Sequence, residues 1–266
     1  MHTLLTNIKP PVRRLYLILF VAMIAFLGCQ WHLRPTDEVA ADEAVAIERF
    51  DRTEMLFLQT GDFAALQQLK TSYPIQTRML IEDVLQLGRV DDTDINTRFL
   101  LFFQDSTLQT LMCDVEQQFA SLDDVSHQLT EAFQRLRTLL PAIELPLVYS
   151  QIGSLDQSII VGDGQLGISL DKYLGSDYPL YLKYGYTEQQ RMMMTRRYIV
   201  PDCLGFYLLS LYPPAADSLR MEHMGRIQYV VNRAMNESFF RNDAVAQAET
   251  FMKQHKGMTV EELLEE

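Results

Sequence analysis

The sequence predicts an α+β fold that is mostly helical, with a small antiparallel sheet inserted near the middle of the chain. Apolar residues recur at helical spacing on both sides of residues 159–202. Between the two helical halves the period changes, and residues 143–150, 158–161 and 167–170 read as strands. A chain of 266 residues is long enough to bury one substantial core.

Turn signals separate the predicted strands. Gly153 and Ser154 follow the first strand, and Gly162, Asp163 and Gly164 lie between the other two. Glycine and aspartate favour tight turns because they tolerate positive φ. Short turns join strands that run in opposite directions. The simplest arrangement is therefore a small antiparallel sheet.

The residues before the sheet predict a series of helices. Residues 44–60 suit a helix or a short strand, since their apolar side chains stand among charges. Asp62 follows a glycine and is a good N-cap for the next helix, and Pro141 ends the last one. Helical spacing then predicts helices at 63–72, 77–87, 95–103, 106–119 and 125–139.

A second series of helices is predicted after the sheet. Pro201 suits the first turn of a buried helix that Pro213 terminates. Thr259 and Glu262 have the spacing of a capping box, which predicts a final short helix. The predicted ranges are 178–184, 187–197, 199–211, 219–235, 243–254 and 259–264.

The N-terminus resembles a bacterial lipoprotein signal. Lys9, Arg13 and Arg14 precede an apolar run of thirteen residues, 15–27, and Gly28 and Cys29 follow it. A membrane-spanning helix needs roughly 20 apolar residues, so the run suits a signal peptide better. An uncleaved anchor helix is the alternative. We predict a signal peptide at 1–28, an acylated tether at 29–44 and a single domain at 45–266.

The predicted anchor places the body of the protein in the cell envelope. Acyl chains on Cys29 would insert into the lipid bilayer, each buried methylene contributing about 0.8 kcal/mol. No aspartate follows Cys29 to suggest inner-membrane retention, which favours the outer membrane, facing the periplasm. Cleavage would change the net charge from −12 to −15 by removing three basic residues. This acidic character argues against nucleic acid as a partner.

The two remaining cysteines leave one question open. Cys113 and Cys203 could form a disulfide in an oxidising compartment. Both lie in apolar helical contexts, however, where a free thiol behaves as a small hydrophobic residue. The sequence therefore favours two free thiols.

Common catalytic motifs do not fit the sequence. Residues 167–171 lack the final glycine of a serine-hydrolase elbow, and the glycines of residues 162–167 are not followed by the helix of a dinucleotide site. The sequence predicts no cofactor and no metal. The histidines do not form a metal-binding pair at helical spacing; they are His2, His32, His127, His223 and His255.

Polar and aromatic side chains in residues 159–202 are the candidate site. Tyrosines at about three-residue spacing there could line a groove for a peptide or glycan, although packing with the hydroxyls at the rim is the simpler interpretation. The aspartates could act as caps or as a carboxylate pair. The predicted partner-binding residues are Asp171, Tyr173, Asp177, Tyr178, Tyr181 and Asp202.

Five motifs, in this order along the chain, resemble the gliding-motility lipoprotein GldB family of the Bacteroidetes. They are IERFDR (47–52), ISLDKYLG (168–175), DYPLY (177–181), YIVPD (198–202) and GRIQYVV (225–231). The resemblance covers residues 45–235, and the C-terminus from Asn236 is shortened or divergent. It implies an envelope lipoprotein associated with gliding and secretion. It also implies a fold similar to zincin-like peptidases without the metal motif, with no catalytic residues to carry over.

Together these observations predict a membrane-anchored, non-catalytic binding or scaffolding protein. Its expected partners are the lipid bilayer, through acylated Cys29, and unidentified envelope proteins. The alternative is an envelope hydrolase that acts on peptide or glycan with central aspartates such as Asp163 and Asp171.

Overall fold

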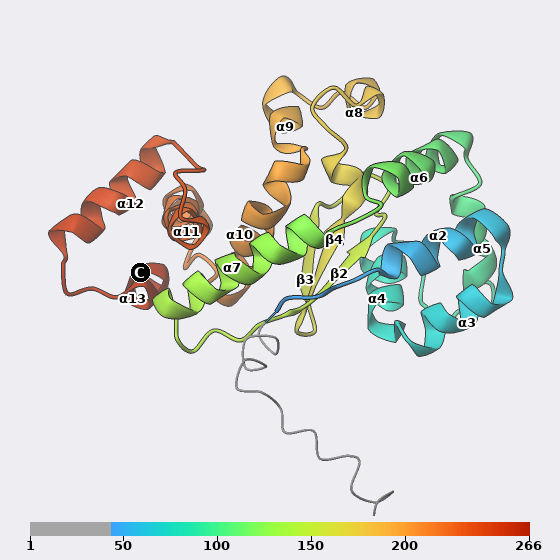
Figure 1. Ribbon diagram of the computed structural model, residues 1–266, viewed down its shortest axis with the longest axis horizontal. Coiled ribbons are helices and arrows are strands. Elements are labelled where there is room, and N and C mark those ends of the chain that lie inside the picture. The colour runs from blue at the N-terminus through green and yellow to red at the C-terminus, as the bar shows by residue number, and fades with distance from the viewer. Residues whose placement is uncertain (1–43) are drawn as a thin grey trace, which may run out of the picture. The chain divides into compact units, whose positions relative to one another are not determined.

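A four-stranded sheet lies at the centre of residues 44–266, the residues that this computed structural model describes (Figure 1). These residues form one unit by themselves. The predicted signal peptide, Cys29 and the tether up to residue 43 lie outside the described residues. No helix among the described residues is long and apolar enough to cross a membrane.

The sheet is mixed, so the predicted antiparallel arrangement is wrong in this detail, whereas the α+β class is confirmed. The strand order is β1 (Ile47–Glu48), β2 (Leu147–Gln151), β4 (Gln165–Ser169) and β3 (Ile159–Gly162). Only β3 and β4 pair antiparallel; β4 pairs in parallel with β2, and β2 in parallel with β1. β4 lies between β2 and β3, so it pairs with β2 in parallel on one side and with β3 on the other. β1, from the start of the domain, pairs with the other edge of β2.

The β3–β4 hairpin forms as its turn residues predict. Gly162 pairs with Gln165, which leaves a two-residue loop. Asp163 and Gly164 both have positive φ, 50° and 72°. Aspartate and glycine are favoured at these positions of a type I′ turn, whose twist matches that of the strands.

Most predicted helices before β2 are present. Asp62 accepts a hydrogen bond from the Ala65 N–H at 2.7 Å, which confirms the predicted N-cap. The helix predicted at 77–87 instead starts at Pro74 and continues as a π-helical turn at Met79–Val84. The helices are α2 (Phe50–Thr60), α3 (Phe63–Thr71), α4 (Pro74–Arg78), α5 (Ile95–Phe102), α6 (Ser106–Gln118) and α7 (Asp123–Leu139).

The helices after β4 also follow the prediction, with one interruption. The helix predicted at 187–197 stops at Met193, because Thr195 is extended and forms a β-bridge with Leu174. The capping box of Thr259 and Glu262 is confirmed. The helices are α8 (Pro179–Lys183), α9 (Glu188–Met193), α10 (Ile199–Leu211), α11 (Arg220–Met235), α12 (Asp243–Gln254) and α13 (Val260–Glu265).

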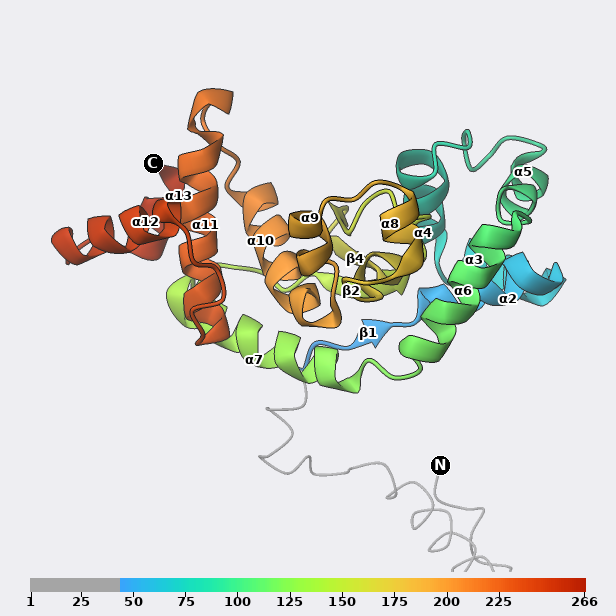
Figure 2. The same cartoon turned by 90° about the horizontal axis from the view of Figure 1, so that it is seen from above.

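The helices form two groups on opposite sides of the sheet. Figures 1 and 2 show α2–α5 on one side of the sheet and α11–α13 on the other, where α7 and α10 lie between α11–α13 and the strands. α10 packs on β3, β4 and α7, and Tyr207 of α10 meets Phe133 of α7 edge-to-face at 5.9 Å. This contact fixes one side of α10 in the core and leaves its other side to form the site described below.

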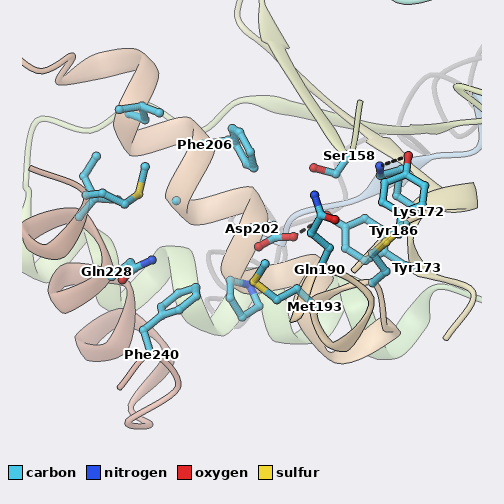
Figure 3. Close-up of a pocket in the computed structure, with 16 residues that line it drawn as sticks. Ser158, Lys172, Tyr173, Tyr186, Gln190, Met193, Asp202, Phe206, Gln228 and Phe240 are labelled. Carbon is cyan, nitrogen blue, oxygen red and sulfur yellow. Dashed lines mark hydrogen bonds between the residues drawn. The ribbon is translucent and has the colours of Figure 1, made fainter. Parts of the chain in front are cut away.

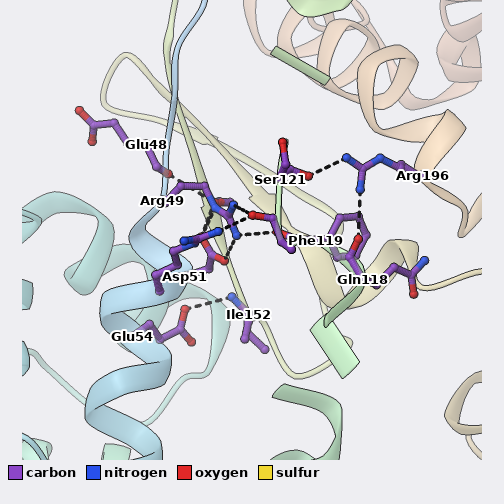
Figure 4. Close-up of polar contacts among 12 residues, drawn as sticks. Glu48, Arg49, Asp51, Glu54, Gln118, Phe119, Ser121, Ile152 and Arg196 are labelled. Carbon is purple, nitrogen blue, oxygen red and sulfur yellow. Dashed lines mark hydrogen bonds and ion pairs between the residues drawn. The ribbon is translucent and has the colours of Figure 1, made fainter. Parts of the chain in front are cut away.

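Two buried carboxylates on α2 fasten the end of β2 (Figure 4). Asp51 accepts a hydrogen bond from Ser150 Oγ at 2.6 Å and pairs with Arg49 at 2.7 Å. Glu54 accepts one from the Ile152 N–H at 3.0 Å. Burial raises the pKa of Glu54 well above its ordinary value, because water no longer stabilises the charged form.

The link between α6 and α7 is held by arginines from two directions (Figure 4). Arg49 donates to the Phe119 carbonyl at 2.9 Å, and Arg196 donates to the Ser121 carbonyl at 2.8 Å. The Phe119 carbonyl is at the C-cap of α6, where a helix leaves its last carbonyls without a partner. Arg196 precedes α10, so its bonds also fix where α10 begins.

Candidate functional site

The six predicted partner-binding residues divide into an interior group and a surface group. Asp171, Tyr173 and Tyr181 are at most 1% exposed, so they stabilise the structure beneath the surface. The Asp177 side chain is 97% exposed. Tyr178 and Asp202 are half-buried. The tyrosines therefore do not form one continuous rim.

Asp171 is the centre of the interior group. Its carboxylate accepts hydrogen bonds from the Gly153 N–H at 2.8 Å and from the Leu155 N–H. The Tyr181 hydroxyl donates to the Asp171 carbonyl at 2.6 Å and accepts from the Leu174 N–H at 3.0 Å. Burial raises the pKa of Asp171, and the two N–H donors act against this shift. These bonds fasten the loop between β2 and β3 to residues 170–174.

Asp177 and Tyr178 lie at the start of α8, and Tyr178 faces α6. The Tyr178 hydroxyl donates to Asp114 Oδ2 on α6 at 2.7 Å. The Tyr178 and Tyr181 rings meet edge-to-face at 5.1 Å. This arrangement joins α8 to α6 and to the interior tyrosines.

A pocket of about 310 Å³ lies beside α10, between residues 158–173, α9 and α11 (Figure 3). We call it the α10 pocket. Its volume is at the lower end of the range for small-molecule sites. Its apolar part is formed by Met193, Phe206, Leu209, Met224, Ile227 and Phe240, and its polar part by Ser158, Lys172, Tyr173, Gln190 and Asp202.

Asp202 is the acidic group of the α10 pocket. Tyr173 Oη donates a hydrogen bond to Asp202 Oδ2 at 2.8 Å, as Figure 3 shows. Burial raises the pKa of Asp202 to about 7, because desolvation disfavours the charged form, and the Tyr173 hydrogen bond reduces this shift. The carboxyl group therefore changes its charge near neutral pH.

Lys172 belongs to the polar part of the pocket, and its ammonium already donates hydrogen bonds within the protein. Its Nζ donates to the Leu155 carbonyl at 3.2 Å and to Tyr186 Oη at 3.1 Å. It also lies 4.5 Å from the centre of the Tyr186 ring. Among the described residues no cationic side chain forms an ion pair with Asp202.

Gly205 lines the pocket one helical turn after Asp202. A Cβ atom at this position would meet nothing within 4 Å. Glycine inside a helix costs about 0.5–1 kcal/mol relative to alanine. Packing inside the fold does not require this glycine, whereas the open volume of the pocket does depend on it.

The central aspartates do not converge on one site. Asp163 is in the β3–β4 turn, where it pairs with Arg78. Asp171 is buried in the loop network, and only Asp202 lines the α10 pocket. Within residues 44–266 no three His, Cys, Asp or Glu side chains come together as a set of metal ligands.

The two described cysteines differ in burial. Cys113 is exposed and Cys203 is buried, and neither forms a disulfide.

Two neighbouring methionines line the α10 pocket. Met193 is 42% exposed and Met194 only 6% exposed. Methionine adapts readily to the shape of what it contacts.

Several pocket residues were outside the sequence prediction. Tyr173 and Asp202 were predicted, but Gln190, Phe206 and the α11 residues were not. The glycine within the apolar helix 199–211 was a usable signal, since a helix interior disfavours glycine. Gln228 and Phe240 carried no such signal, because only the tertiary fold brings them to α10.

The comparisons with known proteins confirm the family resemblance. A family model described as "Gliding motility protein GldB" matches residues 34–239, so α12 and α13 lie beyond the matched region. No curated protein and no solved structure matches the chain, and the likeness to zincin-like peptidases stays a prediction. Since the match covers well over half of the 266 residues, the chain belongs to the GldB gliding-motility family.

Proposed function

We propose that the protein is a non-catalytic binding component of the gliding or secretion machinery, anchored in the cell envelope through acylated Cys29. The observation that carries the binding role is the α10 pocket, a concave and mostly apolar site with a few polar groups at one end. Ligand sites in proteins commonly have this composition. The family supplies the association with gliding motility.

The surroundings of the pocket support binding of a partner. Phe206 and Met193 are both 42% exposed, and both line the pocket. Large apolar side chains left open to water beside a cavity are typical of interaction sites. Two further methionines, Met194 and Met224, let the walls adjust to different shapes.

The positions of the aspartates support the non-catalytic role over the alternative hydrolase. A pair of catalytic carboxylates must flank the same bond, within about 10 Å of each other. Asp171 instead holds main-chain N–H groups inside the fold, and Asp163 pairs with Arg78 in a surface turn. If the protein were such a hydrolase, Asp163→Ala would abolish an activity on peptide or glycan. We expect Asp163→Ala and the wild type to give the same result in an assay of this activity.

The binding role predicts a contact that depends on the pocket. A photo-crosslinking phenylalanine derivative at Phe206, introduced into the full chain in cells, should form a defined adduct. The same group at Leu101, which is 62% exposed on α5, is the matched control and should not form it. Gly205→Leu should abolish the adduct by filling the pocket, and Gly205→Ala should retain it. Equal adducts at both positions, or an adduct unaffected by Gly205→Leu, would contradict the proposed role.

The anchor makes a separate prediction. We propose that the acylated protein is held in the outer membrane, facing the periplasm. Cys29→Ser should leave the signal uncleaved and unlipidated, which a mass shift of the purified protein and cell fractionation will measure. Met23→Ser, within the apolar run, controls for a general loss of export. If Cys29→Ser leaves mass and fractionation unchanged, the lipoprotein assignment is wrong.

A further inference from the structure

Asp202 has an unused acceptor at the polar end of the α10 pocket. Its Oδ2 atom accepts the Tyr173 hydrogen bond, whereas Oδ1 accepts none from the described residues. The side chain is half-buried and lines the cavity. Oδ1 is accessible to solvent from the pocket, so a ligand that displaces this solvent has to supply a donor to the oxygen. The geometry therefore leaves one position for a donor from a ligand.

The groups that face Asp202 do not supply a counter-ion. Tyr173, from the segment before α8, is a neutral donor, and burial holds its pKa well above the ordinary value. Cys203, the neighbour on α10, is also neutral because burial raises the pKa of its thiol. Lys172 and Tyr186 line the pocket but are bonded to each other and to the Leu155 carbonyl. The negative charge on Asp202 is therefore uncompensated.

The rest of the pocket suits the apolar body of a ligand. Phe206 and Gln228 lie on the far side of Asp202 from Tyr173, together with Phe240 (Figure 3). Gly205, between Asp202 and Leu209 on the same helix, leaves room for an aliphatic or aromatic group. A ligand that spans the pocket would place its apolar part here and its head group at Asp202.

We propose that the α10 pocket binds an apolar group that carries a protonated amine, with the ammonium donating a hydrogen bond to the Asp202 carboxylate. This inference rests on the binding function proposed above and names the ligand chemistry of that site. Hydrogen bonds between charged partners are stronger than neutral ones. The acidic net charge of −12 also attracts cations to the protein.

Three probes of the same shape test the inference: benzylamine, benzyl alcohol and benzoate. They are titrated by calorimetry into the full chain in phosphatidylcholine nanodiscs at pH 8, where Asp202 is ionised and the amine is protonated. A charge-assisted hydrogen bond should give benzylamine about a tenfold affinity advantage over the alcohol. Benzoate should bind weakest, since it brings a second negative charge to Asp202.

The pH dependence follows from the pKa of Asp202, which burial raises to about 7. Above this pH the carboxylate is charged and prefers the amine, and at pH 5.5 it is mostly neutral and the preference should fall by several-fold. The ammonium favours the charged carboxylate, so binding near pH 7 should release protons. Calorimetry in buffers of different ionisation enthalpy measures this release.

Two variants separate the head group from the cavity. Asp202→Asn keeps an acceptor for Tyr173 Oη and should remove the amine preference while the alcohol still binds. Gly205→Leu should prevent binding of every probe, with Leu101→Ala on α5 as the control that retains it. If no probe binds, the pocket is not the binding site and the proposed function fails with it. If the alcohol binds as tightly as the amine, or if Asp202→Asn keeps the preference, only the amine inference is overturned.

Peptides and aminolipids both contain a protonated amine, and the titration tests each of these two sources. Phe-Gly-Gly and its N-acetylated form compare a free and a blocked peptide amine. Nanodiscs that contain phosphatidylethanolamine test the lipid, which would compete and weaken benzylamine binding. A preference for the free peptide amine identifies a peptide source, and competition identifies a lipid source; either result supports the inference.

Discussion

Asp171→Ala is expected to lower the free energy of unfolding by about 3 kcal/mol, measured by urea denaturation. The Asp171 carboxylate accepts hydrogen bonds from the buried N–H groups of Gly153 and Leu155. Alanine would leave both donors without a partner, and each buried unsatisfied group costs about 1–3 kcal/mol. Water entering the loop between β2 and β3 would recover part of this loss.

Asp177→Ala is the matched control for this prediction. The residue lies six positions away in the same candidate stretch, yet its side chain is 97% exposed. Substitutions at such surface positions usually change stability by less than about 0.5 kcal/mol. Equal stability of the two variants would show that the Asp171 hydrogen bonds do not hold the loop.

Gly225→Ala is expected to lower the free energy of unfolding by about 2 kcal/mol. A Cβ atom on Gly225 would lie 2.5 Å from Ala244 Cβ and 2.7 Å from the Ala244 carbonyl carbon. α12 would have to move away from α11, and overpacking of this kind typically costs about 1–3 kcal/mol. Hydrogen exchange should show the largest loss of protection in α12.

Gly205→Ala is the control, since it makes the same substitution inside another helix. A Cβ at Gly205 meets nothing within 4 Å, so only the helix propensity changes. We expect this variant to be more stable than the wild type by about 0.5–1 kcal/mol. If both alanine variants are stabilised, the close contact between α11 and α12 is not rigid in solution.

Features that depend on neighbouring residues were predictable from the sequence. The Asp62 N-cap, the Asp163–Gly164 turn and the Thr259–Glu262 capping box each involve residues within three positions of one another. Helical periodicity located α10 with the observed bounds, Ile199–Leu211. Motifs spread along the chain also identified the family, since a motif can be recognised without knowing its contacts.

The arrangement of the strands needed the tertiary structure. β1 is two residues long and pairs with β2, although seven helical elements separate the two strands in the sequence. A hairpin turn fixes its own strand pair, but nothing local specifies that β4 inserts between β2 and β3. The sequence therefore predicted the strands but not their mixed order.

The candidate site shows the same division between local and tertiary information. Sequence alone predicted a lipoprotein signal, and it determined the helical halves and a central stretch rich in aspartate and tyrosine. Only the fold decided that Asp171 and Tyr181 lie inside the protein while Asp202 faces a cavity. Side chains of the same type can be buried or exposed according to what packs over them. The α10 pocket exists because Ser158, Asp202 and Phe240, which are distant in the sequence, meet around α10.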